Sequence, residues 1–136
     1  MNRPLVLAEW RLARLALSAA QVLVRNRIYP DAVSRAYYSI LHSAKALLQS
    51  KDVSAESHAA VKRLFGLHLV KTGDLEAEWA SLLAEGLDDR LAADYDSERV
   101  VSEQEARAQT QCAAAFLKHA RKFLVRQGIK AGELRV

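Results

Sequence analysis

Arg35, Tyr38 and His42 follow one another at spacings of three and four residues, which places their side chains on one face of a helix. A guanidinium holds a phosphate through its planar fork, and an imidazole that titrates near neutral pH can move a proton when a ribose 2′-hydroxyl cleaves RNA. Arg35 and His42 stand roughly 10 Å apart along a helix axis, so only a symmetric second chain would bring both to one phosphorus atom. A solvated helix face with an aromatic lid explains the same spacing, and both interpretations stay open.

Another arginine, Arg90, falls where an apolar residue is due in a predicted helix, and Asp94 follows one turn later on the same stripe. A charge among apolar side chains must be paired or must face a wet cleft, because an unpaired buried charge costs several kcal/mol. An i, i+4 ion pair is the commoner use of this pattern, and a ligand-binding cleft bordered by Tyr95 is the alternative. The candidate catalytic residues are therefore Arg90, Asp94 and His42, and the candidate nucleotide- or RNA-binding residues are Arg35, Tyr38, Arg90 and Tyr95.

Familiar motifs for metal or nucleotide-hydrolysing sites are missing from the sequence. It has no glycine-rich phosphate loop, no cysteine cluster and no histidine pair at the i, i+4 spacing of a helical zinc site. We therefore expect no metal and no cofactor. Apart from His42 the histidines are scattered, and a lone histidine on a helix is more often structural than catalytic.

The composition fits a small globular protein. With 136 residues the chain has room for one domain, and 51% hydrophobic and 26% charged residues are ordinary values. One cysteine, no secretory signal and no long charge-free apolar stretch predict a cytoplasmic protein without membrane contact. Twenty basic against sixteen acidic residues leave a net charge of +4, which permits an acidic partner such as RNA without requiring one.

Helices alone must position these residues, because the chain is rich in Ala and Leu and lacks the alternation of strands. Amphipathic patterns with their start and stop residues predict helices over residues 5–25, 31–49, 57–70, 75–93 and 102–127. The fold class is all-α, a single up-and-down bundle of about five helices over residues 1–127 with a loose C-terminal tail over residues 128–136.

Two of these helices carry specific expectations. The helix over residues 5–25 has only a narrow polar stripe, and so broad an apolar surface predicts burial by a second subunit, hence a homodimer. The helix over residues 31–49 has a nearly ideal core face, formed by Val33, Ala36, Tyr37, Ile40, Leu41, Ala44, Leu47 and Leu48.

Three sequence blocks in the right order resemble the HEPN domain, the higher eukaryotes and prokaryotes nucleotide-binding family of small helical bundles. The first block is Arg35-Ala-Tyr-Tyr-Ser-Ile-Leu-His42-Ser-Ala-Lys-Ala-Leu-Leu48. The second combines Ser57-His58 with Phe65, His68 and the run Val70-Lys71-Thr72-Gly73-Asp74-Leu75. The third is Arg90-Leu-Ala-Ala-Asp-Tyr95-Asp96, so the resemblance covers about residues 5–125.

This resemblance implies an up-and-down bundle with a HEPN-like four-helix core that dimerises and acts beside a minimal nucleotidyltransferase in a toxin–antitoxin pair. The chain would then be the nucleotide- or RNA-binding component of that pair. In some relatives the partner adenylylates a tyrosine near the arginine motif, which makes Tyr95 a candidate acceptor.

Many HEPN relatives are metal-independent endoribonucleases with the active site at the dimer interface. They carry an Arg, four to six residues and then a His near the position of Arg90, whereas this chain has Asp94 and Tyr95 there and no following His. The Arg-x4-6-His motif is thus not intact near Arg90, and Arg35 with His42 fits the spacing only on a different helix. An RNase toxin that uses Arg90 with Asp94 or His42 across the dimer is the alternative function.

Overall fold

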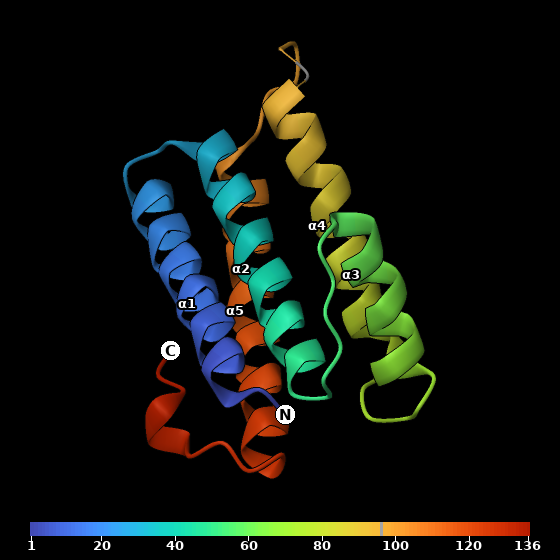
Figure 1. Cartoon of the computed structure of the whole chain (residues 1–136). Coiled ribbons are helices and arrows are strands. Elements are labelled where there is room, and N and C mark those ends of the chain that lie inside the picture. Colours follow the sequence, from blue (N-terminus) through green and yellow to red (C-terminus); the bar gives the residue numbers. More distant parts are fainter. Residues whose placement is uncertain (96) are drawn as a thin grey trace.

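Two long antiparallel helices, α1 (Arg3–Arg25) and α2 (Tyr29–Gln49), form the N-terminal half of the molecule (Figure 1). The computed structural model describes residues 1–95 and 97–136, with the side chains of residues 87–89 and 91–95 left undescribed. The remaining helices are α3 (His58–Phe65), the π-helical turn η1 (Gly66–Val70), α4 (Ala77–Tyr95), α5 (Glu103–Arg126) and the 3-10 turn η2 (Ala131–Glu133). No strand occurs in the described part of the chain, so the prediction of an all-α bundle of about five helices is confirmed.

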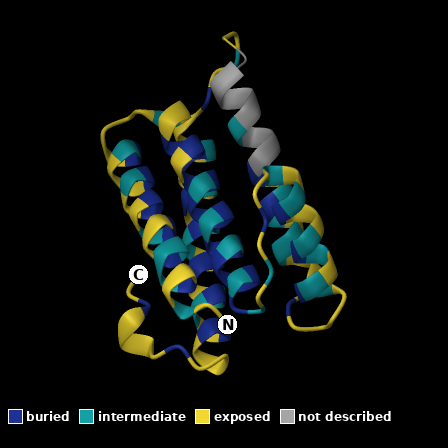
Figure 2. Cartoon of the chain, in the orientation of Figure 1, coloured by how far each residue is buried: buried dark blue, intermediate teal, exposed yellow. Residues whose placement is uncertain are grey.

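The helix α2 occupies the centre of the bundle and contacts every other long helix (Figure 1). All eight residues of its predicted core face are buried, and Figure 2 shows α2 almost entirely in the colours of buried and half-buried residues. Even its polar positions Ser39 and Ser43 are buried, and the Ser39 hydroxyl donates a hydrogen bond of 2.8 Å to the Ala13 carbonyl of α1. Along its middle, the accessible strip of α2 runs through Arg35, Tyr38, His42, Lys45 and Gln49.

Short polar side chains cap the helices where the sequence predicts. Ser57 accepts a hydrogen bond from the Ala60 amide at the start of α3, and Ser102 accepts one from the Glu105 amide at the start of α5. Ser102 and Glu105 have the types and spacing of a capping box, but the box forms only in part, because the Glu105 carboxylate pairs with Arg99.

Most of the predicted helix boundaries differ from the observed ones by one or two residues, and two of the differences have a clear physical reason. Helix α2 begins at Tyr29 rather than Asp31, because Pro30 lacks an amide hydrogen and fits the first helical turn, where none is needed. The helix predicted over residues 57–70 changes at Gly66 from an α-helix to the π-helical turn η1.

The C-terminal segment is packed against the bundle, so the prediction of a loose tail is wrong. Ile129 and Leu134 are fully buried, and the Arg121 guanidinium of α5 donates hydrogen bonds to the carbonyls of Leu134 at 2.7 Å and Ala131 at 3.0 Å. The Trp10 indole of α1 donates another, of 2.9 Å, to the Arg135 carbonyl. Buried apolar side chains and satisfied carbonyls therefore hold a segment that has little regular secondary structure.

None of the helices, as far as the structure describes them, combines the length and apolar character that crossing a membrane requires.

Candidate functional site

Tyr38 lies at the centre of the accessible strip of α2 and is contacted by two arginines. The Arg35 guanidinium carbon lies over the Tyr38 ring at 4.7 Å from its centroid, and that of Arg90 lies over the same ring at 5.2 Å. Arg35 precedes Tyr38 by one helical turn, whereas Arg90 comes from α4, which packs against α2. The fold therefore joins the first and third sequence blocks in one cation–π cluster.

His42 belongs to the same cluster and is fixed from α1. Its ring stacks near Tyr38 with a centroid separation of 6.4 Å, and its Nδ1 lies 2.7 Å from a carboxylate oxygen of Glu9. Since a carboxylate only accepts, Nδ1 carries the hydrogen of this bond and Nε2 is the nitrogen left for other groups. The other oxygen of Glu9 lies 3.3 Å from the Lys45 ammonium.

The carboxylate of Glu9 is held in its ionised form. Burial acts to raise the pKa of this group, but the hydrogen bond from His42 and the positive charge of Lys45 outweigh burial and leave that pKa below its ordinary value. Glu9 thereby orients His42 and Lys45 at the edge of the site, as a carboxylate commonly orients an imidazole.

His58 approaches Tyr38 from the start of α3. Its Nδ1 shares a hydrogen bond of 2.7 Å with the Tyr37 hydroxyl, and its ring meets the Tyr38 ring edge-on with centroids 6.2 Å apart. Burial lowers the pKa of His58, and the positive charge of Arg90 lowers it further. His58 is therefore a neutral imidazole at neutral pH, beside an arginine.

Tyr37 is the buried partner in this pair. Burial raises its pKa to about 12, although the charge of Arg90 acts in the opposite direction. The phenol consequently keeps its proton at any physiological pH. On its other side Tyr37 lies close to α4, because a Cβ at Gly86 would stand 3.2 Å from its ring. The glycine allows α4 to come close enough for Arg90 to reach the cluster.

Two hollows open beside the cluster. One, of about 430 Å³, lies between α1 and α2 and is lined by Leu12, Leu15, Ala16, Ala19, Arg35, Tyr38 and His42. The other, of about 210 Å³, lies between α2 and α3 and is lined by Tyr38, Leu41, His42, Lys45, Ala55, Glu56, Ser57, His58 and Val61. Tyr38 and His42 line both, so a ligand in either hollow would touch them.

The charges around Tyr38 favour an anion. Arg35 and Lys45 bring positive charge to the cluster beside the Arg90 guanidinium, and Glu9 offsets the charge of Lys45. Arg35 has no ion-pair partner among the described residues and is exposed. Guanidinium groups bind phosphates in bidentate fashion, and tyrosine and arginine faces stack on bases, so the arrangement suits a phosphate that carries a base.

Sequence reasoning found part of this site. Arg35, Tyr38, His42 and Arg90 come together. The side chains of Asp94 and Tyr95 lie outside the described residues, so their expected places in the cleft stay predictions. The residues that sequence reasoning missed are Glu9, Tyr37, Lys45 and His58.

The signals for the missed residues were weak. His58 stood in the second sequence block, and Lys45 lay on the accessible stripe of its helix. Tyr37 stood in the first sequence block and on the predicted core face of its helix, whereas nothing local marks Glu9. No group of three or more metal-ligating side chains occurs in the part of the chain that the structure describes.

A family model and several similar proteins show what this chain is related to. The family model of the HEPN domain matches residues 8–123. Two proteins of Methanocaldococcus jannaschii that carry the name "Putative toxin" are similar to this chain. One is 41% identical over 68% of this chain and 69% of its own length. The other is 32% identical over 89% of this chain and 82% of its own length. A UPF0332 protein of Gloeobacter violaceus is 32% identical over 82% of this chain and 90% of its own length.

Proposed function

The chain belongs to the HEPN domain family, and from this premise we propose that it is a dimeric nucleotide- or RNA-binding protein of a toxin–antitoxin pair. The observation that carries the proposal is the Tyr38 cluster, in which the guanidinium groups of Arg35 and Arg90 lie over one accessible aromatic ring. A phosphate would bind the guanidinium groups, and a base would stack on the exposed parts of the same cluster.

The dimer would complete the site. Arg35 and His42 line the hollow between α1 and α2 together with Leu12 and Leu15, which are 43% and 54% exposed. Exposed leucines beside a charged site are expected where a second subunit docks, because covering them removes apolar surface from water. The second copy would then bring its own cluster toward the same cleft.

The partner proposal rests on the relatives. Two proteins similar to this chain carry the name "Putative toxin", which supports a role in a toxin–antitoxin pair. The HEPN resemblance further implies that the other member is a minimal nucleotidyltransferase. In that arrangement the partner would supply or control the activity, and Tyr95 is the proposed acceptor if the partner transfers an adenylyl group.

Substitution of Arg90 tests the proposal. We expect Arg90→Gln to weaken binding of ATP and of the dinucleotide UpU at least about tenfold, as loss of a charged hydrogen-bonding group would. Isothermal titration measures the affinities, and thermal melting measures stability. Arg63→Gln on α3 removes an exposed arginine away from the cluster and is the matched control. A variant that melts earlier but binds normally would show that Arg90 is only structural.

A metal-independent endoribonuclease is the second candidate function, and the position of His58 favours it. In this candidate function the general base that is missing from the sequence near Arg90 would be the neutral imidazole of His58, which comes from α3 and contacts Tyr38. In such a reaction an imidazole nitrogen takes the proton of a ribose 2′-hydroxyl, the 2′-oxygen bonds to phosphorus, and the bond to the 5′-oxygen breaks. The leaving 5′-oxygen takes a proton from water or from His42, and Arg90 would hold the phosphate.

Cleavage of end-labelled RNA in the presence of EDTA tests this candidate. Metal-independent cleavage that is lost in His58→Asn and in Arg90→Gln, but kept in the control His68→Asn, would support an enzyme. Absence of cleavage at protein concentrations that saturate RNA binding would exclude the endoribonuclease and leave nucleotide or RNA binding as the function.

A further inference from the structure

We propose that two hollows along α1, one beside the C-terminal segment and one beside α5, together form a groove that binds the phosphodiester backbone of a single nucleic-acid strand through Arg14, Arg25 and Arg135. This groove lies apart from the Tyr38 cluster. The proposal goes beyond the function assigned to that cluster, because it requires neither the dimer nor the cluster to be active.

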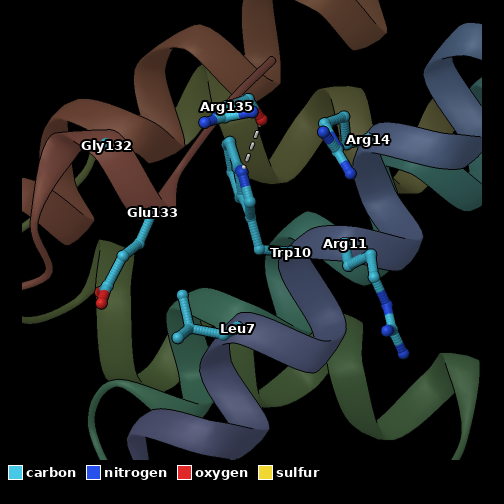
Figure 3. Close-up of a pocket in the computed structure, with 7 residues that line it drawn as sticks. All are labelled: Leu7, Trp10, Arg11, Arg14, Gly132, Glu133 and Arg135. Carbon is cyan, nitrogen blue, oxygen red and sulfur yellow. Dashed lines mark hydrogen bonds between the residues drawn. The ribbon is translucent and has the colours of Figure 1, made fainter.

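The first part of the groove is a hollow of about 400 Å³ beside Trp10, shown in Figure 3. Its lining residues are Leu7, Trp10, Arg11, Arg14, Gly132, Glu133 and Arg135. Figure 3 shows Arg14 and Arg135 near the two sides of the Trp10 ring, whereas Arg11 extends away from it. Two arginines from distant parts of the sequence therefore border one hollow, with an apolar wall between them.

The fold holds the backbone of Arg135 beside the hollow at Trp10. Its carbonyl accepts the hydrogen bond from the Trp10 indole, and the neighbouring Leu134 is fully buried with its own carbonyl bonded to Arg121. The backbone on which Arg135 stands is thus held on both α1 and α5, while its side chain is exposed. Such a fixed backbone reduces the entropy that a ligand must overcome to order the side chain.

The charges of this hollow are not neutralised by the protein. Arg11, Arg14 and Arg135 have no ion-pair partner within the described part of the chain. Glu133, the acidic residue of the lining, is paired with Arg3. Arginine stays protonated at any working pH, so the like charges of Arg14 and Arg135 at one hollow repel each other, and an anion bound between them would relieve this repulsion.

A second hollow lies further along α1, between this helix and α5. It measures about 420 Å³ and is lined by Gln21, Val24, Arg25, Arg107, Thr110, Gln111 and Ala114. Arg25 has no ion-pair partner among the described residues, and Arg107 bonds only weakly to the exposed Glu103, at 3.4 Å. Arginine and glutamine side chains are donors that suit phosphate oxygens.

The two hollows are aligned along α1. Arg14 and Arg25 are separated by eleven residues, which corresponds to roughly 16 Å along a helix axis. They belong to the narrow polar stripe of this helix. The hollow next to the Tyr38 cluster uses other α1 positions, including Leu12 and Ala19. An elongated anion with repeated charges fits this spacing better than a single small anion would.

Fluorescence anisotropy with a labelled twelve-nucleotide oligouridylate tests the proposal. The test variant carries Arg14→Gln and Arg135→Gln, and the matched control carries Lys62→Gln and Arg63→Gln, two exposed positions of α3 with the same loss of charge. We expect the test variant to bind at least about tenfold more weakly at low salt, and the slope of log affinity against log salt concentration to fall by about 1.4 for two lost phosphate contacts. The control should change neither value by as much as half of that.

Competition distinguishes the sources of the anion. Oligouridylate should be displaced by a DNA strand of the same length, but not by inorganic pyrophosphate or by polyglutamate at equal charge concentration. Displacement by pyrophosphate would mean a site for small free phosphates, and displacement by polyglutamate would mean a docking surface for an acidic protein; either result overturns the strand assignment. Equal losses in test and control variants overturn it as well.

The oligonucleotide test of the groove is independent of the proposed function at the Tyr38 cluster. Titration with ATP reports the Tyr38 cluster, and the test variant should bind ATP like the wild type. If Arg90→Gln leaves ATP binding unchanged while the groove variant loses the oligonucleotide, the proposed function fails and the groove stands.

Discussion

The Tyr37 hydroxyl and Nδ1 of His58 lie 2.7 Å apart, although 21 residues separate them in the sequence. This bond joins the central helix α2 to the start of α3, and the two rings are also stacked, with an interplanar angle of 10°. Arg90 influences both groups, since its charge adds to the burial that lowers the pKa of His58 and opposes the burial that raises the pKa of Tyr37. The pair therefore connects the attachment of the α3 hairpin to the electrostatics of the candidate site.

We predict that the free energy of unfolding falls as pH drops below about 6.5, and that His58 contributes to this fall. A histidine whose pKa is lower in the folded chain than in the unfolded chain binds protons more readily when unfolded. Its effect is absent well above the ordinary pKa and grows as the pH falls through that value toward the folded pKa. Urea denaturation at pH 7 and pH 5 measures the change.

His58→Asn should reduce this pH dependence, whereas His68→Asn on the turn after α3 should leave it as in the wild type. Identical pH dependence in all three proteins would show that His58 is not held in its neutral form by the fold.

We predict that Glu9→Gln increases the affinity for ATP several-fold, because it removes the carboxylate that offsets Lys45 in the Tyr38 cluster. The same change should lower the free energy of unfolding by about 1 kcal/mol, since the hydrogen bond between Glu9 and His42 is weakened. Isothermal titration and urea denaturation measure the two effects, and Glu85→Gln on the exposed side of α4 is the control. Weaker ATP binding in Glu9→Gln would mean that the orientation of His42 matters more than the charge.

We predict that the protein is a dimer at micromolar concentration and that Leu15→Glu separates it into monomers. Leu15 is 54% exposed and belongs to a row of accessible apolar residues on α1, which comprises Leu5, Leu12, Leu15 and Val22. A buried carboxylate at such an interface would lose its hydration without gaining a partner. Light scattering behind a sizing column distinguishes the dimer from a 15.1 kDa monomer.

Leu67→Glu is the matched control for the dimer, because Leu67 is 44% exposed on a different element, η1. A wild-type chain that elutes as a monomer would contradict the dimer. It would also contradict the proposal that a second copy brings its own Tyr38 cluster toward the same cleft.

Long periodic patterns and capping residues were sufficient to predict the helices. The core face of α2 follows from eight apolar positions repeated at helical spacing, a signal that no local feature opposes. Ser57 and Ser102 mark two helix starts because their hydroxyl groups satisfy backbone amides locally, without help from the rest of the fold. Arg35, Tyr38 and His42 share a face for the same local reason.

Contacts between distant segments could not be predicted in this way. Glu9 reaches His42, and His58 reaches Tyr37, only because of how α1 and α3 pack on α2. Neither Glu9 nor His58 breaks a pattern in its own segment, so a single sequence gives no reason to select it. The packing of the C-terminal residues 128–136 could not be predicted for the same reason, since their partners Trp10 and Arg121 lie far away along the chain.

We predict that Leu134→Ala lowers the free energy of unfolding by about 2–5 kcal/mol, the range for deleting a buried leucine side chain. Leu134 is fully buried, and its neighbours Ala131 and Arg135 are tied to Arg121 and Trp10 by hydrogen bonds. Removing its methyl groups would open a cavity between the tail and the bundle. Val136→Ala, at a position that is 62% exposed, should change the stability by less than about 0.5 kcal/mol.

Leu134→Ala should also weaken binding of the oligonucleotide, because Arg135 loses its fixed place at the end of the groove along α1. Trp10→Phe separates the two effects, since it removes the hydrogen bond to the Arg135 carbonyl while it keeps an aromatic ring in the core. We expect Trp10→Phe to cost about 1 kcal/mol of stability and to weaken oligonucleotide binding less than Arg135→Gln does. If Leu134→Ala is as stable as Val136→Ala in urea denaturation, the tail is not part of the folded core and its arginine is not positioned by it.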